Sequence, residues 1–182
     1  GLYNDFKTDY PESEYNRYIS PLIDEIIEFH ETANSDFGEN IKFVENYQKL
    51  NTLNEVASTL PKAKIYVDVW ASWCGPCKTE FAHKKELDSL LQKNNIEMLY
   101  LSIDRDRDTT QWKNMIKFYN LEGFHIRANE ELSSELRKLF DNNGSLSIPW
   151  YILIDNNGKI LKKFASRPSQ IEKLAIELNE IN

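Results

Sequence analysis

Apolar residues are spaced differently in the first third of this chain and in the rest. Between residues 15 and 29 they recur every three or four positions, which predicts an amphipathic helix. Pro21 interrupts this segment, so the pattern fits either two helices or one kinked helix. Residues 34–38, Asn-Ser-Asp-Phe-Gly, are mostly polar and end in glycine, and we expect the helical region to break there.

Shorter segments follow before residue 61. A second helix is expected over about 39–50. The capping-box pattern Thr52-Leu-Asn-Glu55 predicts a short helix that stops before Pro61. We therefore expect an N-terminal helical extension, residues 1–51, followed by a separate domain, residues 52–182.

Strand and helix alternate from residue 64 onward. Near-continuous apolar runs predict strands that are buried on both faces. The predicted strands are 65–70, 96–103, a short segment at 124–127, 150–155 and 159–164, and the predicted helices are 76–92, 109–119, 131–140 and a last helix capped by Ser169. Asn156-Asn-Gly158 predicts a hairpin turn, because its residues tolerate positive φ. This order predicts an α/β fold, with a central mixed β-sheet flanked by helices.

Composition agrees with a globular protein. The chain has 182 residues, of which 41% are hydrophobic and 28% charged. No run approaches the roughly 18 apolar residues that span a bilayer, so no transmembrane segment is expected. The formal net charge is −7 and no stripe of Lys and Arg appears, which argues against nucleic-acid binding.

The N-terminus begins Gly-Leu-Tyr-Asn-Asp-Phe and carries neither an initiator Met nor a signal peptide. We expect it to be the start of a mature or trimmed chain. The absence of a signal sequence here therefore leaves the cellular compartment open.

The chain has only two cysteines, three positions apart, which favours a role in a reaction over a structural disulfide that stabilises the fold. Two alternatives remain. Cys74 and Cys77 could be half of a zinc site, although His30, His83 and His125 lack the spacing of a second pair of ligands, so no metal is expected. They could also form a purely structural disulfide, although so short a loop constrains the unfolded chain little.

The two cysteines lie in Trp73-Cys-Gly-Pro-Cys-Lys78, between a predicted strand and a predicted helix. The N-terminus of a helix stabilises a thiolate, the nucleophilic form of cysteine, at Cys74. Pro76 fits the first turn, where no backbone N–H is needed. Gly75 leaves room for a substrate disulfide. The two-residue spacer lets Cys77 close a ring with Cys74 and release the substrate.

The segment Val67-Asp-Val-Trp-Ala-Ser-Trp-Cys-Gly-Pro-Cys-Lys78 resembles the active-site signature of the thioredoxin superfamily. Glu80, the strand and loop over 96–104, and Ile148-Pro149 resemble the TlpA/ResA-like branch of that superfamily. The resemblance covers roughly residues 52–182 and implies a thioredoxin-like fold.

The resemblance also implies roles. Cys74 would attack a substrate disulfide and Cys77 would resolve the mixed disulfide. Pro149 would be cis and would face the two sulfurs, and the backbone of Ile148 would pair with an extended substrate segment. The predicted substrate-binding residues are Trp73, Gly75, Pro76, Ile148, Pro149 and Trp150. For Trp150, a place in the core is the alternative to a contact platform.

Two acids accompany the cysteines. Asp68 lies within an apolar strand, and burial without a partner would raise its pKa. Such a group suits a proton acceptor for Cys77, and thioredoxins carry an acid at the matching position. Glu80 lies one helical turn after Cys77, and we expect it to modulate this step. A hydrogen-bonded core acid for Asp68 and an ordinary first-turn helix acid for Glu80 are the alternatives.

The predicted function is a thiol–disulfide oxidoreductase of protein substrates, with no cofactor beyond the redox-active Cys74–Cys77 pair. The Gly-Pro spacer is that of thioredoxin and favours a reductase. The resemblance implies a periplasmic or cell-envelope location, a membrane tether in a removed segment, a membrane electron donor and tasks such as cytochrome c maturation. A cytoplasmic location stays open. A thiol peroxidase and a non-enzymatic interaction module are the alternative functions.

Overall fold

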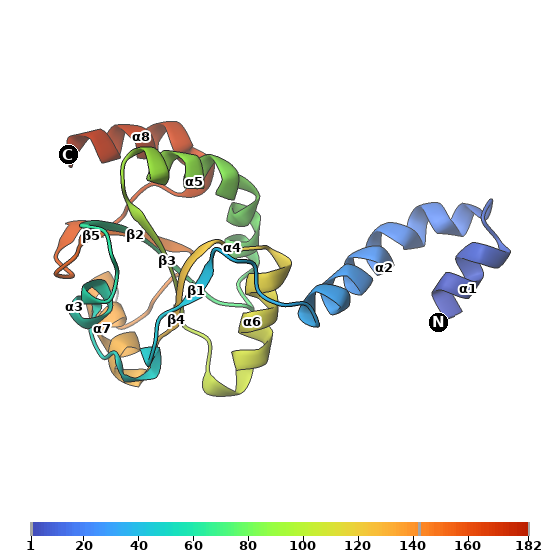
Figure 1. Cartoon of the computed structure of the whole chain (residues 1–182), viewed down its shortest axis with the longest axis horizontal. Coiled ribbons are helices and arrows are strands. Elements are labelled where there is room, and N and C mark those ends of the chain that lie inside the picture. The colour runs from blue at the N-terminus through green and yellow to red at the C-terminus, as the bar shows by residue number, and fades with distance from the viewer. Residues whose placement is uncertain (1, 142, 182) are drawn as a thin grey trace. The chain divides into compact units, whose positions relative to one another are not determined.

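The computed structural model describes residues 2–141 and 143–181. The chain divides into two compact units, one ending at Asp36 and the other beginning at Phe37. The first unit holds the helices α1 (Leu2–Asp9) and α2 (Glu14–Ala33), shown in blue in Figure 1. Pro21 lies inside α2, so the repeat of apolar residues forms a single helix.

Side-chain contacts join the two helices of the first unit. The hydroxyl of Tyr3 donates to Ser20 Oγ at 2.7 Å, and Lys7 Nζ pairs with Asp24 at 3.3 Å. These contacts connect the first turns of α1 to the middle of α2.

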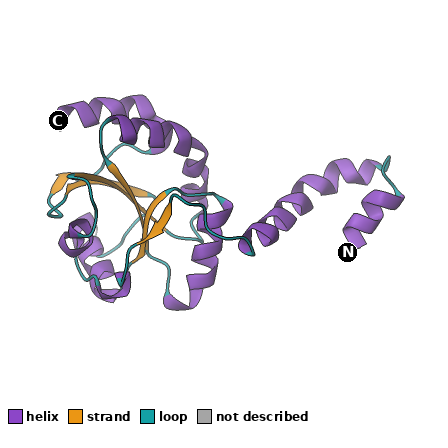
Figure 2. Cartoon of the chain, viewed as in Figure 1, coloured by secondary structure: helices purple, strands orange, loops and turns teal. Residues whose placement is uncertain are grey.

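The second unit is built on a mixed sheet, whose strands are orange in Figure 2. Its six strands lie in the order β1-β4-β3-β2-β5-β6. β1, β4, β3 and β2 run parallel to one another, β5 is antiparallel to β2, and β6 is antiparallel to β5. The strands are β1 (Ile41–Phe43), β2 (Lys64–Trp70), β3 (Glu97–Ser102), β4 (Gly123–Arg127), β5 (Trp150–Asp155) and β6 (Ile160–Lys162). The α-helices are α3 (Leu53–Ser58), α4 (Gly75–Glu80), α5 (Lys84–Lys93), α6 (Thr109–Phe118), α7 (Glu130–Phe140) and α8 (Ile171–Glu180), and 3₁₀ turns are η1 (Tyr47–Lys49), η2 (Phe81–His83), η3 (Asp106–Asp108) and η4 (Pro168–Gln170).

Helices cover both faces of this sheet. α5 and α8 lie side by side on one face, and α3 and α7 lie across the sheet from them (Figure 1). The sheet is therefore buried on both sides, as the near-continuous apolar runs of β2, β3 and β5 predict. This arrangement confirms the predicted α/β fold with a central mixed sheet.

β2 lies between β3 and β5, and its alternate side chains point to opposite faces. Trp70 packs edge-on against Phe81 of η2, with ring centroids 5.3 Å apart. Tyr66 and Asp68 share the face of Trp70 because they lie four and two positions before it. The helical segment that carries the cysteines therefore packs over the polar side of β2.

The helix predicted over 39–50 is wrong. The structure has β1 and η1 there, and β1 pairs with β4 in parallel register. Ile41, Val44 and Tyr47 are buried at intervals of three residues, which imitates the repeat of a helix. A three-residue strand is too short to display the alternation of a strand, so only its pairing partner reveals it.

Two boundaries nearer the site also differ. The single helix predicted over 76–92 is divided into α4, η2 and α5. Ser169 does not cap the last helix, because it lies within η4 and Gln170 occupies the N-cap position of α8. The polar groups of Ser169 have another partner, which is described below.

Candidate active site

Cys74 and Cys77 lie just beyond the C-terminal end of β2 and are joined in a disulfide, with their Cα atoms 5.3 Å apart. Cys74 is the N-cap of α4, and its Sγ accepts a hydrogen bond from the backbone N–H of Cys77 at 3.2 Å. Pro76 lies in the first turn, as its missing N–H requires. The sequence thus places one sulfur at the helix N-terminus and the other one turn inside.

The approach to this disulfide is open on one side. Cys77 is fully buried, and Cys74 is 4% exposed. A Cβ built on Gly75 meets no atom within 4 Å, so the space above this residue is free. Trp73 is 60% exposed next to Cys74. A partner molecule can therefore reach Cys74 over Gly75 and beside the Trp73 ring, whereas Cys77 is covered.

Asp68 is a buried acid with an unsatisfied oxygen. It is 1% exposed, and its Oδ1 has no hydrogen-bond partner in the described part of the chain. Burial raises the pKa of Asp68 well above its ordinary value, and the negative charge of Glu80 raises it further. Asp68 shares its face of β2 with Trp70, whose ring packs against Phe81 directly after α4, so Asp68 lies on the side of the sheet that carries α4.

Glu80 is the last residue of α4 and not part of its first turn, so the interpretation as a first-turn helix acid is wrong. Its carboxylate accepts hydrogen bonds from Ser169 N at 2.9 Å and Ser169 Oγ at 3.1 Å. Arg167 Nη1 lies 3.4 Å from the same carboxylate. Glu80 therefore links the end of α4 to the segment that leads into α8.

The peptide bond between Ile148 and Pro149 is cis, which confirms the expected isomer. Pro149 directly precedes β5, whose first residue, Trp150, is paired with Val69 of β2. The register therefore places Pro149 at the end of the sheet from which the chain leaves β2 towards Cys74.

Trp150 belongs to the core. It is 3% exposed, its indole Nε1 donates to Lys163 O at 2.7 Å, and its ring packs edge-on against Phe140. The prediction that Trp150 offers a contact platform is therefore wrong, and its alternative, a place in the core, is correct. Phe164, which the sequence did not single out, is 55% exposed beside the Trp150 ring.

A polar network that the sequence did not single out joins the loop before Cys74 to the end of β3. Asp104 accepts hydrogen bonds from Ser72 N at 2.8 Å, Ser72 Oγ at 2.7 Å and Ser102 Oγ at 2.7 Å. The available signal was an acid directly after an apolar strand and a serine between another strand and the cysteine motif.

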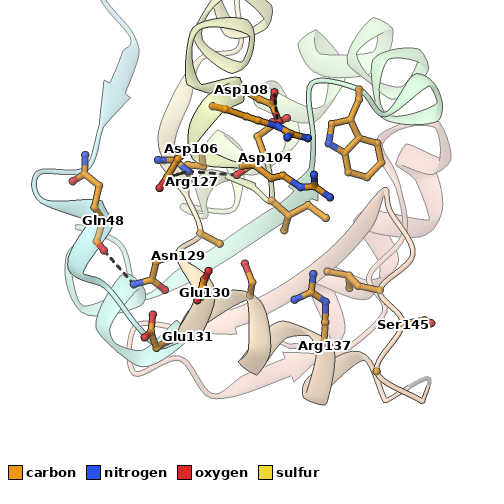
Figure 3. A pocket seen from close by; sticks show the side chains of 18 residues that line it. Gln48, Asp104, Asp106, Asp108, Arg127, Asn129, Glu130, Glu131, Arg137 and Ser145 are labelled. Carbon is orange, nitrogen blue, oxygen red and sulfur yellow. Dashed lines mark hydrogen bonds and ion pairs between the residues drawn. The ribbon is translucent and has the colours of Figure 1, made fainter.

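A cavity of about 1340 Å³ adjoins this network, and Trp73 lines it. Figure 3 shows Asp104, Asp106 and Arg127 together on its wall, with Arg137 on α7 at another part of the wall. Arg127 pairs with Asp106. The cavity thus extends from the exposed Trp73 towards α7.

Within residues 2–141 and 143–181, no group of three or more His, Cys, Asp or Glu side chains is arranged to hold a metal ion. In the same part of the chain, no helix has both the length and the apolar character that a membrane crossing requires.

Comparison with known proteins finds thiol–disulfide oxidoreductases that are similar to this chain. A ResA thiol-disulfide oxidoreductase from Bacillus thuringiensis subsp. konkukian is 26% identical over 117 residues, which are 64% of this chain and 62% of that protein. The chain thus matches less than two thirds of that relative. A DsbD thiol:disulfide interchange protein from Actinobacillus pleuropneumoniae is 30% identical over 79 residues, 43% of this chain and 13% of its own length.

A solution structure from Bacteroides vulgatus, of a protein assigned as a thiol-disulfide oxidoreductase, superimposes with a TM-score of 0.55 at 33% identity. The alignment covers 69% of this chain and 77% of that one. The family model for Redoxin matches residues 36–175, which include the whole sheet, α4 and both cysteines. The chain therefore belongs to the Redoxin family and carries, on a thioredoxin-like fold, the disulfide of a CXXC motif.

Proposed function

We propose that this chain reduces disulfides in protein substrates, with Cys74 as the nucleophile and Cys77 as the resolving cysteine. The observation that carries the proposal is the position of Cys74 Sγ, which caps α4 and accepts the Cys77 N–H. Donors at this position stabilise a thiolate, and the thiolate is the attacking form. Cys77 is fully buried and can meet only a sulfur already bound at Cys74.

The reaction takes two exchanges. The Cys74 thiolate bonds to one sulfur of the substrate disulfide, and the other substrate sulfur leaves as a thiolate. Cys77 then gives its proton to Asp68 and attacks Cys74 Sγ, which releases the second substrate sulfur. The substrate gains two electrons, and the Cys74–Cys77 disulfide forms. A thiol donor must then reduce this disulfide before the next cycle.

Asp68 suits the role of proton acceptor because it is buried and has a free oxygen. Its raised pKa brings its proton affinity closer to that of a thiol, which favours transfer in both directions. Glu80 modulates this step through its charge, which is among the causes of the raised Asp68 pKa. Trp73, Gly75, Pro76, Ile148 and Pro149 contact the substrate in this proposal.

The Gly-Pro spacer supports a reducing poise, since thioredoxin lies near −270 mV. Equilibration of the purified protein with glutathione buffers measures this potential. We expect a value below about −230 mV, and a value above roughly −180 mV would contradict a reductase. Failure to consume peroxide, measured in parallel, would separate disulfide exchange from thiol peroxidase activity.

The resemblance to the TlpA/ResA-like branch supports a place in the cell envelope, a membrane thiol–disulfide electron donor and a task such as cytochrome c maturation. Substrate trapping tests this part of the proposal. The Cys77→Ser variant, expressed in the native cells, should accumulate mixed disulfides through Cys74, and the Cys74→Ser variant should not. Capture of cytoplasmic proteins alone would contradict the envelope location.

A further inference from the structure

The loop that leads to Cys74 is held by a single carboxylate. Ser72, two residues before Cys74, donates both its backbone N–H and its hydroxyl to Asp104, at 2.8 and 2.7 Å. Asp104 lies two residues beyond the end of β3, so the two ends of this contact are 32 residues apart in sequence. The two bonds engage both carboxylate oxygens and therefore fix the orientation of the loop as well as its distance from β3.

The contact is deeply buried and fully satisfied. Ser72 is 1% and Asp104 2% exposed. Ser102 Oγ donates a third hydrogen bond to Asp104, at 2.7 Å, and Arg127 Nη1 lies 3.5 Å from the Asp104 carbonyl oxygen (Figure 3). A buried carboxylate is costly unless donors compensate it, and three donors do so here. Removal of one donor or of the acceptor therefore weakens the attachment of the whole loop.

The sheet does not require this contact. The parallel ladder between β2 and β3 extends to the pair Trp70 and Ser102, and Ile103 N donates to Trp70 O at 2.9 Å beyond it. Asp104 acts where the ladder has ended. The two hydrogen bonds from Ser72 to Asp104 therefore order the three residues that join β2 to Cys74 and add no strand pairing.

We infer that Asp104 is a positioning residue for Cys74: by holding Ser72, it keeps Cys74 Sγ at the N-terminus of α4. The Cys74 N–H donates to Ala71 O at 3.0 Å, so the backbone on both sides of Ser72 forms one tight turn. If this turn moves, Cys74 Sγ moves away from the Cys77 N–H that stabilises its charge. This inference rests on the proposed role of Cys74 as the nucleophile.

Two substitutions test the inference. Ser72→Ala deletes the hydroxyl bond and keeps the Asp104 charge. Asp104→Asn keeps the side-chain shape but offers one acceptor oxygen to the three donors, and it removes a buried negative charge. That loss of charge by itself lowers the pKa of a nearby thiol. A rise in the pKa of Cys74 in this variant can therefore come only from lost positioning.

The measurement is the pH dependence of Cys74 alkylation by iodoacetamide in the reduced protein, with the melting temperature followed in parallel. We expect both variants to raise the pKa of Cys74 and to slow alkylation at pH 7 by about threefold or more. The double variant should be no slower than the slower single variant, because both substitutions break one contact. Asp108→Asn is the matched control, since Asp108 pairs with the exposed Arg107 in the same loop, and it should alkylate as wild type does.

The outcomes separate the two proposals. If Cys77 is alkylated before Cys74 in the wild-type protein, the proposed function is wrong. If wild-type Cys74 reacts first, and the variants melt at a lower temperature with an unchanged Cys74 profile, Asp104 is merely structural. A fall in the pKa of Cys74 in Asp104→Asn would mean that Asp104 acts through its charge, and that result also overturns the positioning role.

Discussion

The carboxylate of Glu80 holds Ser169 by two hydrogen bonds, one from the backbone N–H at 2.9 Å and one from the hydroxyl at 3.1 Å. The two residues are 89 positions apart, and the contact places a negative charge of fixed position at the end of the helix that contains Cys77. This charge is close enough to Asp68 to raise its pKa.

Replacement of Glu80 by Gln should therefore lower the pKa of Asp68 towards its ordinary value, because the repulsion between the two carboxylates is lost. The Asp68 carboxyl resonance, followed by NMR against pH, reports this directly. Glu86→Gln, at an exposed position of α5, is the control and should leave the Asp68 titration unchanged. An unshifted Asp68 titration in Glu80→Gln would show that burial alone sets this pKa.

Asp68→Asn should separate the proton acceptor from the nucleophile. The rate at which Cys77 resolves a mixed disulfide should fall about 100-fold, the usual contribution of a general base. Attack by Cys74 should change little. Stopped-flow measurement of the two exchange steps distinguishes these rates, and an unchanged resolution rate would remove Asp68 from the mechanism.

The same variant should be more stable than the wild type at neutral pH. A raised Asp68 pKa means that the folded state binds more protons than the unfolded state between the two pKa values, so stability falls as pH rises through that window. Asn cannot ionise, so the Asp68→Asn variant should not lose stability as pH rises through this window. Urea unfolding at pH 5 and pH 8 measures the effect, and an identical pH dependence in both proteins would argue against a raised pKa.

His125 predicts a second, opposite pH dependence. It is fully buried, and burial lowers its pKa to about 4. The folded state then binds fewer protons than the unfolded state, so stability is lost as pH falls from about 6.5 to about 4, by about 3 kcal/mol. His125→Gln should remove most of this dependence, measured by urea unfolding across that range. His83→Gln, at an exposed position, should retain it.

Gly158 and Gly144 form a matched pair for a test of the hairpin. Both have positive φ, +74° and +78°. A Cβ on Gly158 would lie 2.6 Å from Asn54 Cα, whereas a Cβ on Gly144 meets nothing within 4 Å. Gly144→Ala should cost about 1 kcal/mol from backbone strain alone. Gly158→Ala should cost more than twice as much, because the backbone at Asn54 must shift. Thermal unfolding of both variants decides this, and equal losses would contradict the close approach.

The fold was largely predictable from the sequence because its central strands, β2, β3 and β5, are apolar runs of six or seven residues, long enough to be recognised. β2, β3 and β5 lie where the pattern predicts them. β1 was missed, since a three-residue strand depends on its partner β4, whose first residue lies 82 positions from Ile41 in sequence and whose pairing no local pattern encodes.

In the candidate site, too, local features could be predicted from the sequence and contacts between distant segments could not. Cys74, Cys77 and Pro76 form a local motif whose spacing is itself the signal, and Asp68 was recognisable as an acid in an apolar strand. The partners Ser72–Asp104 and Glu80–Ser169 are set by tertiary contacts between distant segments. The sequence predicts Ser169 as a helix cap because serine is common at that position. In the structure its hydrogen bonds go instead to Glu80, a distant partner that no local pattern indicates.

In the proposed reaction, the atom that caps α4, Cys74 Sγ, changes its covalent partner during exchange. Cys74 Sγ occupies the place that an Asp or Ser oxygen holds in most helices. This sulfur is bonded to Cys77, bonded to a substrate sulfur, or free as a thiolate. Each state offers a different electron density to the Cys77 N–H, which donates to this sulfur. The chemical shift of the Cys77 amide should therefore differ between the reduced protein, the mixed disulfide and the Cys74–Cys77 disulfide, and should report which of these forms is present.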